Sequence, residues 1–334
     1  MFVIRNSFVV GILYLSAIIG AGFATGREIM TFFGAFGYIG FVGLVLACLL
    51  IGFCGAKALL IVRERKIENP HELNIAIGGK HGGQIITILC GLFAYSAYVI
   101  MLAGIRQLTN ESLLAVVLVS VCAYAVLYKG FDTLTNICGV LAPLSVILIT
   151  ILVLYGSFRL NTETIDDISY NTSVFEMIFK AILYAGYNVL TSLCVLGRCR
   201  NILKTKKNAI FGGTIGAIML FFSAGAILFS ILHAKVPVSG SEMPVLVLLE
   251  DKNALLLISI LIAMLVSAIT GLTGTCIFFD GIIPEKKLGA ILGIIAIPLS
   301  YISFGNLMDF LYPIFGFAGI FLMIMLALSG DKNV

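Results

Sequence analysis

The stretch Tyr14-Leu-Ser-Ala-Ile-Ile-Gly20-Ala-Gly22-Phe-Ala-Thr-Gly26-Arg-Glu28 carries three closely spaced glycines in an otherwise apolar run. Each glycine lowers helix propensity by about 1 kcal/mol relative to alanine, so a helix is expected to be interrupted here. A membrane tolerates backbone without helical partners only where protein or a watery cavity surrounds it. The stretch therefore predicts a transmembrane helix that breaks near the bilayer midplane beside a solute site.

A second stretch, Ile182-Leu-Tyr-Ala185-Gly-Tyr-Asn188-Val-Leu-Thr-Ser192, stands at the matching place in the second half of the chain. Gly22 and Gly186 lie about half a chain apart, and an aromatic residue follows each of them. We expect this helix to break as well. If each half holds five spans, the odd number inverts one half relative to the other, as in the inverted repeats of many transporters.

The composition indicates a membrane protein. Of the 334 residues, 60% are hydrophobic and only 11% are charged, and the mean hydropathy is +1.11. Soluble domains are typically about 45–50% apolar. One transmembrane helix needs roughly 20 apolar residues. We therefore predict an all-α polytopic membrane protein with about ten transmembrane helices, of which helices 1 and 6 are broken. The predicted spans are residues 7–33, 37–62, 83–107, 111–128, 133–157, 174–197, 208–232, 254–278, 287–304 and 307–328.

The spans form one membrane domain over residues 1–334, with repeat 1 at about 7–158 and repeat 2 at about 173–328. Most of the 21 Lys and Arg residues fall on one side if the N-terminus is cytoplasmic. The positive-inside rule thus predicts a multi-pass plasma-membrane protein with both termini in the cytoplasm. The basic cluster at 204–207 fits this topology better than nucleic-acid binding, so no nucleic-acid partner is expected. The sequence does not predict an oligomeric state.

The glycine stretch at 20–26 has three interpretations. A dinucleotide loop is excluded, because the spacing is not GxGxxG and no strand precedes it. Small-residue packing is an alternative, since Gly22 and Gly26 are four residues apart and would let two helices approach closely. An unwound hinge explains more, because Thr25-Gly26-Arg27-Glu28 then restarts a half-helix. The amides near residues 24–27 and the positive end of that half-helix would suit a carboxylate.

The ten-span plan with breaks in spans 1 and 6 resembles the amino acid-polyamine-organocation superfamily, which has the five-plus-five inverted fold of sodium-coupled symporters. The string Gly20-Ala-Gly-Phe-Ala-Thr-Gly-Arg-Glu28 is similar to the signature of bacterial YkvI-like membrane proteins. The resemblance implies that a substrate carboxylate meets amides of the span 1 break and that its ammonium meets carbonyls of spans 1 and 6. The implied pocket residues are Gly20, Ala21, Gly22, Phe23, Ala24, Thr25, Gly26, Ala185, Gly186, Tyr187 and Asn188.

Span 8 carries hydroxyl groups in an apolar helix. Ser267 and Thr270 are three residues apart and share a helix face. Both hydroxyls could simply bond back to carbonyls one turn earlier, and this alternative stays open. The resemblance implies a sodium site in which these hydroxyls act with backbone oxygens of Ser16 and Ile19. Proton-coupled relatives can use a lysine in span 5, which is missing from residues 133–157, so sodium is preferred.

Charged residues in spans are functional candidates by default. Arg27 lies on the outer half of span 1 and Asp309 on the outer turn of span 10, and the resemblance implies that they close an outer gate. Pairing of Arg27 with Glu28, or with lipid headgroups, is the alternative. In span 3, Tyr95 lies near mid-depth and is expected to cover the substrate site, although aromatic packing is also open to it.

The sequence thus predicts a secondary transporter that works by alternating access. Its substrate is expected to be a small zwitterionic or carboxylated solute, an amino acid, coupled to sodium. A proton-coupled transporter and a non-transporting receptor or structural protein on the same fold are the alternatives. An enzyme is not expected, because His71, His81 and His233 all fall in loops and no HExxH motif occurs. Eight cysteines without metal-ligand spacing indicate no metal site, and we expect no cofactor apart from the coupling ion.

Overall fold

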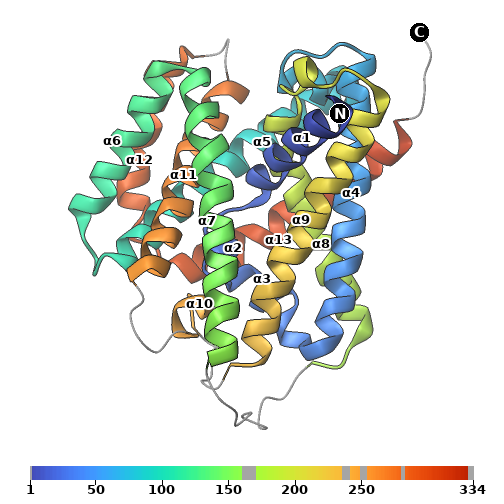
Figure 1. The fold of residues 1–334 in the computed structure, drawn as a ribbon. Coiled ribbons are helices and arrows are strands. Elements are labelled where there is room, and N and C mark those ends of the chain that lie inside the picture. The colour runs from blue at the N-terminus through green and yellow to red at the C-terminus, as the bar shows by residue number, and fades with distance from the viewer. Residues whose placement is uncertain (1, 160–170, 235–240, 249–253, 280–282, 330–334) are drawn as a thin grey trace.

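The computed structural model describes residues 2–159, 171–234, 241–248, 254–279 and 283–329. Within these residues the chain is helical throughout its spans (Figure 1). The elements are α1 (Phe2–Ile18), α2 (Ala21–Ala24), α3 (Arg27–Phe32), η1 (Gly34–Ile39), α4 (Gly40–Glu64), α5 (Pro70–Leu108), α6 (Leu113–Lys129), α7 (Phe131–Arg159), α8 (Val174–Leu196), η2 (Arg200–Ile202), α9 (Lys206–Leu232), α10 (Pro244–Val247), α11 (Ala254–Phe278), α12 (Glu285–Leu299) and α13 (Phe304–Leu328).

These elements reproduce the ten predicted spans. Seven helices among the described residues are long and apolar enough to cross a membrane. The interrupted series α1–α3 and the shorter helices α6 and α12 complete the ten. The largest shift in boundaries concerns span 3, because α5 begins at Pro70 instead of residue 83, with a kink at Gly79, whose φ is 68°. Spans 9 and 10 also shift, because α12 ends at Leu299 and the Ser303 side chain caps a new helix that begins at Phe304. The extents of the two repeats remain a prediction.

The helices pack as two groups. On one side α8 and α9 each pack against both α1 and α4, and on the other α5, α6, α11 and α12 pack together (Figure 1). The groups meet where α5 packs on α8. Helix α13 packs on α8 and α5 and so touches both groups. Because apolar side chains bind lipid as well as they bind each other, close packing of small residues is what holds such helices together.

The predicted break in span 6 is wrong, because α8 is one uninterrupted helix from Val174 to Leu196. Gly186 is required for packing instead. A methyl group at this position would lie 2.5 Å from the carbonyl oxygen of Gly316 and 3.0 Å from the amide nitrogen of Ile320, both backbone atoms of α13. The Asn188 side chain donates a hydrogen bond to the Tyr184 carbonyl one turn earlier and stays within the helical pattern. Close helix contact therefore explains this glycine.

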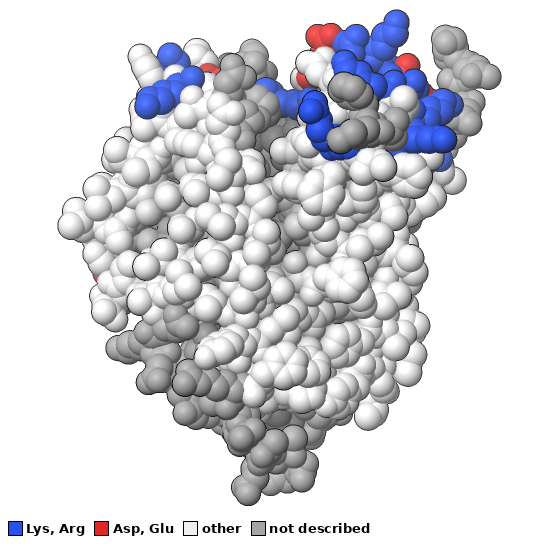
Figure 2. Space-filling model, in the orientation of Figure 1, with Lys and Arg blue, Asp and Glu red and all other residues white. Residues whose placement is uncertain are grey.

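Basic side chains gather at one end of the molecule, where α1 begins and α13 ends (Figures 1 and 2). They surround a polar groove lined by Arg63, Glu64, Lys66, Arg200, Asn201, Leu203, Lys204 and Lys206. Two ion pairs stabilise the group, Lys206 with Glu64 and Arg200 with Glu68. Figure 2 shows no comparable gathering of described basic residues over the rest of the visible face. This is the distribution that the positive-inside rule expects of a cytoplasmic end.

Candidate functional site

The predicted interruption of the first helix is confirmed. Helix α1 ends at Ile18, the single turn α2 follows, and α3 begins after Gly26, whose φ of 77° lies in the left-handed region that favours glycine. The amides of Ala24 and Gly26 were expected to be free for a carboxylate, but they donate to the carbonyls of Gly20 and Phe23. For these two amides the expectation is corrected, because both bond within residues 20–26.

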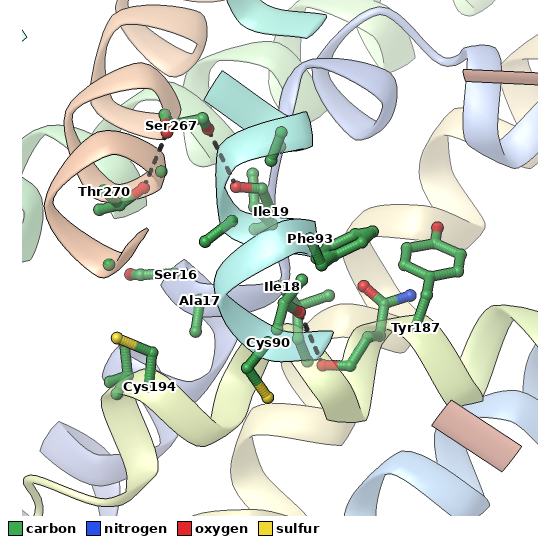
Figure 3. A pocket seen from close by; sticks show the side chains of 18 of the residues that line it. Ser16, Ala17, Ile18, Ile19, Cys90, Phe93, Tyr187, Cys194, Ser267 and Thr270 are labelled. Atoms are coloured by element: carbon green, nitrogen blue, oxygen red, sulfur yellow. Dashed lines mark hydrogen bonds between the residues drawn. The ribbon is translucent and has the colours of Figure 1, made fainter. Parts of the chain in front are cut away.

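A cavity of about 150 Å³ lies beside this break, between α1 and α8 on one side and α5 and α11 on the other (Figure 3). A cavity of this size holds a molecule of about the size of benzene. Its described lining includes Leu13, Ser16, Ala17, Ile18, Ile19, Gly20, Glu28, Cys90, Phe93, Ala94, Ala97, Met101, Leu134, Gly139, Tyr187, Asn188, Thr191, Cys194, Val195, Ser267, Thr270, Gly271, Gly274, Ile277, Phe278 and Tyr312.

Only part of the predicted substrate set lines this cavity. Gly20, Tyr187 and Asn188 do so. Gly186 is occupied by the contact with α13, and the side chain of Ala21 lies outside the described part of the structure. The predicted residues that are not among the described lining are Gly22, Phe23, Ala24, Thr25, Gly26, Ala185 and Gly186. Since α8 does not unwind, it offers the cavity side chains in place of the expected free carbonyls.

Tyr95 does not cover the site. Its hydroxyl donates to the Leu292 carbonyl of α12, 3.2 Å away, and its ring contacts Tyr98. The face of α5 that meets the cavity carries Phe93, Ala97 and other residues spaced three and four apart. Tyr95 is two positions from both and points to another side of the helix. Phe93 is the aromatic residue that α5 presents to the cavity.

Glu28 was expected only as a charge in span 1 and a partner of Arg27, but it lines the cavity. Its side chain is only 1% exposed and accepts a hydrogen bond from the Tyr187 hydroxyl at 2.7 Å. Tyr312 and the backbone of Phe23 also lie next to this carboxyl. Of the four ion pairs among the described residues, none includes Glu28. The sequence carried one signal for this role, an acidic residue inside an apolar span. Successive residues of a helix point about 100° apart, so Glu28 cannot point in the same direction as Arg27.

Arg27 pairs with Asp309, the partner that was predicted for it. Its guanidinium forms an ion pair with Asp309 at 2.7 Å and donates to the Ser241 carbonyl at 3.0 Å. Asp309 and Tyr312 are three residues apart on one face of α13. That face therefore contacts the start of α3 at two places, where Asp309 pairs with Arg27 and where Tyr312 lies next to Glu28.

A short segment around α10 covers the break from the same side as this ion pair. The Val245 amide donates to the Thr25 carbonyl at 2.9 Å, and Pro244 and Val245 are buried. Glu242 accepts a hydrogen bond from Ser303, the residue that caps α13. In the other direction the cavity continues to Val195 and Phe278, near the ends of α8 and α11 that lie toward the basic groove. The site is thus closed on the side of α10 and extends toward the opposite end.

The residues predicted to hold sodium meet where α1 ends. The Ser267 hydroxyl lies 3.3 Å from the Ile19 carbonyl, and Ser16 and Thr270 line the same part of the cavity (Figure 3). Each hydroxyl also bonds within its own helix, Ser16 to Ile12, Ser267 to Ala263 and Thr270 to the Ser267 carbonyl. Because the helix breaks here, the Ile19 carbonyl has no amide partner one turn later in the chain. The oxygen atoms of Ser16, Ile19, Ser267 and Thr270 therefore gather at this end of the cavity.

A ten-span bundle with a discontinuous first helix and a central cavity defines a multi-pass helical membrane protein. No family model matches the chain. The chain is similar to two Bacillus subtilis proteins, the uncharacterized membrane protein YkvI, 26% identical over 92% of this chain and 91% of YkvI, and the uncharacterized protein YyaD, 25% identical over 95% of each. The resemblance to YkvI-like membrane proteins is thereby confirmed.

Solved structures share the fold at low sequence identity. The Eremococcus coleocola manganese transporter superposes with a TM-score of 0.62 at 17% identity, covering 98% of this chain and 77% of the transporter. A Na⁺-coupled sialic acid symporter gives 0.60 at 14% identity, covering 98% and 79%. MhsT in complex with L-phenylalanine gives 0.53 at 14% identity, covering 97% and 87%. These likenesses show the transporter fold of the chain.

Proposed function

We propose that this protein is a secondary transporter that moves a small zwitterionic or carboxylated solute, an amino acid, together with sodium by alternating access. One observation carries the proposal: the cavity sits against the break that follows α1, between two packed groups of helices. A cavity between two bodies can be exposed to either side when they tilt. The kinds of cargo named for the structural neighbours, a metal ion, sialic acid and an amino acid, support small polar solutes as a class.

The proposed motion is a rocking of one helix group against the other. Spans 1, 2, 6 and 7, which are α1–α4, α8 and α9, would tilt against the scaffold of spans 3, 4, 8 and 9, which are α5, α6, α11 and α12. A carboxylate on the substrate would lie beside Ser16, Thr191 and Thr270, whose hydroxyl groups would turn from the carbonyls of their own helices to donate to it. Uptake of radiolabelled amino acids into proteoliposomes under an imposed sodium gradient tests the proposal. A receptor on the same fold would bind solute and produce no flux.

Sodium coupling can be tested separately at Ser267 and Thr270 of α11, beside the end of α1. Replacing both Ser267→Ala and Thr270→Ala removes two oxygen ligands of a hard cation, so stimulation of uptake by sodium is expected to disappear. The double variant is compared with Ser259→Ala, which removes a buried hydroxyl of the same helix that bonds to the Leu255 carbonyl away from the cavity. Unchanged sodium stimulation in the double variant would contradict the assignment, and a proton gradient is then the coupling force to examine.

The ion pair of Arg27 with Asp309 is proposed to close the outer gate. Asp309→Asn is expected to lower uptake several-fold while costing at most about 1 kcal/mol of stability, because Asp309 is half exposed and exposed pairs are weak. The exchange of the two charges, Arg27→Asp with Asp309→Arg, is expected to restore part of the uptake. Glu111→Gln, which breaks the pair with Arg106, serves as the control. Full uptake by Asp309→Asn would exclude the gate role.

A further inference from the structure

We propose that Glu28, Asn188 and the aromatic rings around them form an ammonium-binding subsite, so that the transported solute must carry a cationic amino group. The inference rests on the proposed transport function for the purpose of the site, and it deepens that proposal by excluding solutes that carry only a carboxylate. This subsite takes the role that the sequence prediction gave to free backbone carbonyls of a broken span 6, because the intact helix α8 has no such carbonyls.

Glu28 has no cationic partner in any described ion pair. Its carboxyl is buried, borders the cavity, accepts a hydrogen bond from Tyr187 and lies next to Tyr312. Phenol hydroxyls orient a carboxylate but carry no positive charge. The nearest cation along the chain, Arg27, is already committed to Asp309 and Ser241. A buried carboxylate without a counter-charge is costly, and a cation that enters the cavity removes that cost.

A second acceptor belongs to the same cavity. Asn188 is fully buried and lines the cavity, and its Nδ2 group donates to the Tyr184 carbonyl. Its Oδ1 atom has no hydrogen-bond partner among the described residues. Buried polar atoms are nearly always paired in folded proteins, so an unpaired acceptor at a cavity wall indicates a missing donor. An ammonium group has three donors and no acceptor, which suits this amide oxygen and the carboxylate together.

The rings around Glu28 add a third feature. The ring centroids of Tyr187 and Tyr312 lie 4.8 Å apart, and Phe93 lies 6.2 Å from Tyr187 and 6.3 Å from Tyr312. All three side chains line the cavity. Aromatic faces attract organic cations, most strongly where water is excluded. The same faces repel a carboxylate, so the rings and the acid select for the same sign of charge.

Three ligands with the same branched hydrocarbon chain but different charged groups test the subsite. Leucine carries both charged groups, 3-methylbutylamine carries only the ammonium, and 4-methylpentanoate carries only the carboxylate. The matching sets for alanine and phenylalanine extend the size range. We expect the amine-bearing members to raise the thermal stability of the purified protein in detergent, and the carboxylates to leave it unchanged. Equal stabilisation by the carboxylates, or stabilisation by none of the amines, would overturn the proposal.

Glu28→Gln keeps the size of the side chain and removes its charge. We expect amine affinity, measured by calorimetry, to fall roughly ten- to a hundredfold in this variant. Asn188→Leu, which removes the unpaired acceptor at similar volume, is expected to weaken binding less. Glu111→Gln, a variant of an exposed acid outside the cavity, should bind like wild type. Unchanged amine affinity in both Glu28→Gln and Asn188→Leu would overturn the subsite.

The two proposals can fail separately. Amines that bind wild type with the expected dependence on Glu28, yet show no flux in proteoliposomes, would support the subsite and contradict transport. Flux of the carboxylate-only probes with no preference for amines would support transport and contradict the subsite.

Discussion

Gly22→Ala is expected to abolish amine binding and uptake while leaving the protein folded and inserted. A methyl group on Gly22 would collide with the Glu28 carboxyl and with the end of the Met308 side chain. All of these obstacles are side-chain atoms and none is backbone, so the fold can give way at modest cost. The Glu28 carboxyl cannot move without leaving the Tyr187 hydroxyl. We therefore expect an effect on function that is much larger than the effect on stability.

Gly20→Ala provides the matched control for this prediction. Gly20 belongs to the same interruption, but a methyl group there would meet only Met101 Cε, at an ordinary distance of 3.8 Å. Uptake assays and thermal unfolding of the two variants are compared side by side. Uptake by Gly22→Ala at the level of Gly20→Ala would show that the placement of Glu28 is not needed.

Gly186→Ala is expected to cause the largest loss of stability of any single methyl addition proposed for this protein. The added carbon would lie 2.5 Å from the Gly316 carbonyl oxygen and 3.2 Å from the Gly319 carbonyl carbon. Because these obstacles are backbone atoms, α8 and α13 must move apart. Overpacking of this kind costs about 1–3 kcal/mol, and separation of two rigid helices belongs at the upper end.

Gly225→Ala is the control for this second prediction. A methyl group on Gly225 of α9 would touch Phe41 at 3.8 Å and Leu44 at 3.9 Å, which is ordinary contact. This substitution is expected to be neutral or to gain up to about 1 kcal/mol from helix propensity. Thermal unfolding in one detergent measures both variants. A melting temperature of Gly186→Ala equal to that of wild type would contradict the packing role and reopen the hinge interpretation of α8.

The contrast between the two predicted breaks shows how far local sequence reasoning extends. At residues 20–26 three glycines act on one short stretch, and the chain interrupts its helix there. At residues 185–188 there is a single glycine and no proline, and the cost of that glycine, about 1 kcal/mol, is small against the packing that it permits. The difference depends on Gly316 and Gly319, which lie far away in the sequence and next to Gly186 in space. The apparent symmetry of the two stretches did not extend to their backbones.

Glu28 and Tyr95 illustrate the same limit for side chains. The sequence identified Arg27, Glu28 and Asp309 as charges in apolar spans, and the ion pair of Arg27 with Asp309 forms as proposed. The partners of Glu28 depend on how α3 meets α8 and α13, which no local pattern encodes. Tyr95 faces α12 because of the rotation of α5 about its axis, and a shift of one residue would have turned it elsewhere.

By itself the sequence determined the membrane class, the number and order of the spans, the interruption after Ile18 and the gathering of basic residues at one end. These properties follow from composition, from runs of apolar residues and from glycine density, all of which act over one helix or less. Only the tertiary structure decided that α8 stays whole, that Tyr95 turns away and that Glu28 enters the cavity. Such outcomes depend on which faces of distant helices meet, because contacts between helices outweigh the small local preferences that the sequence displays.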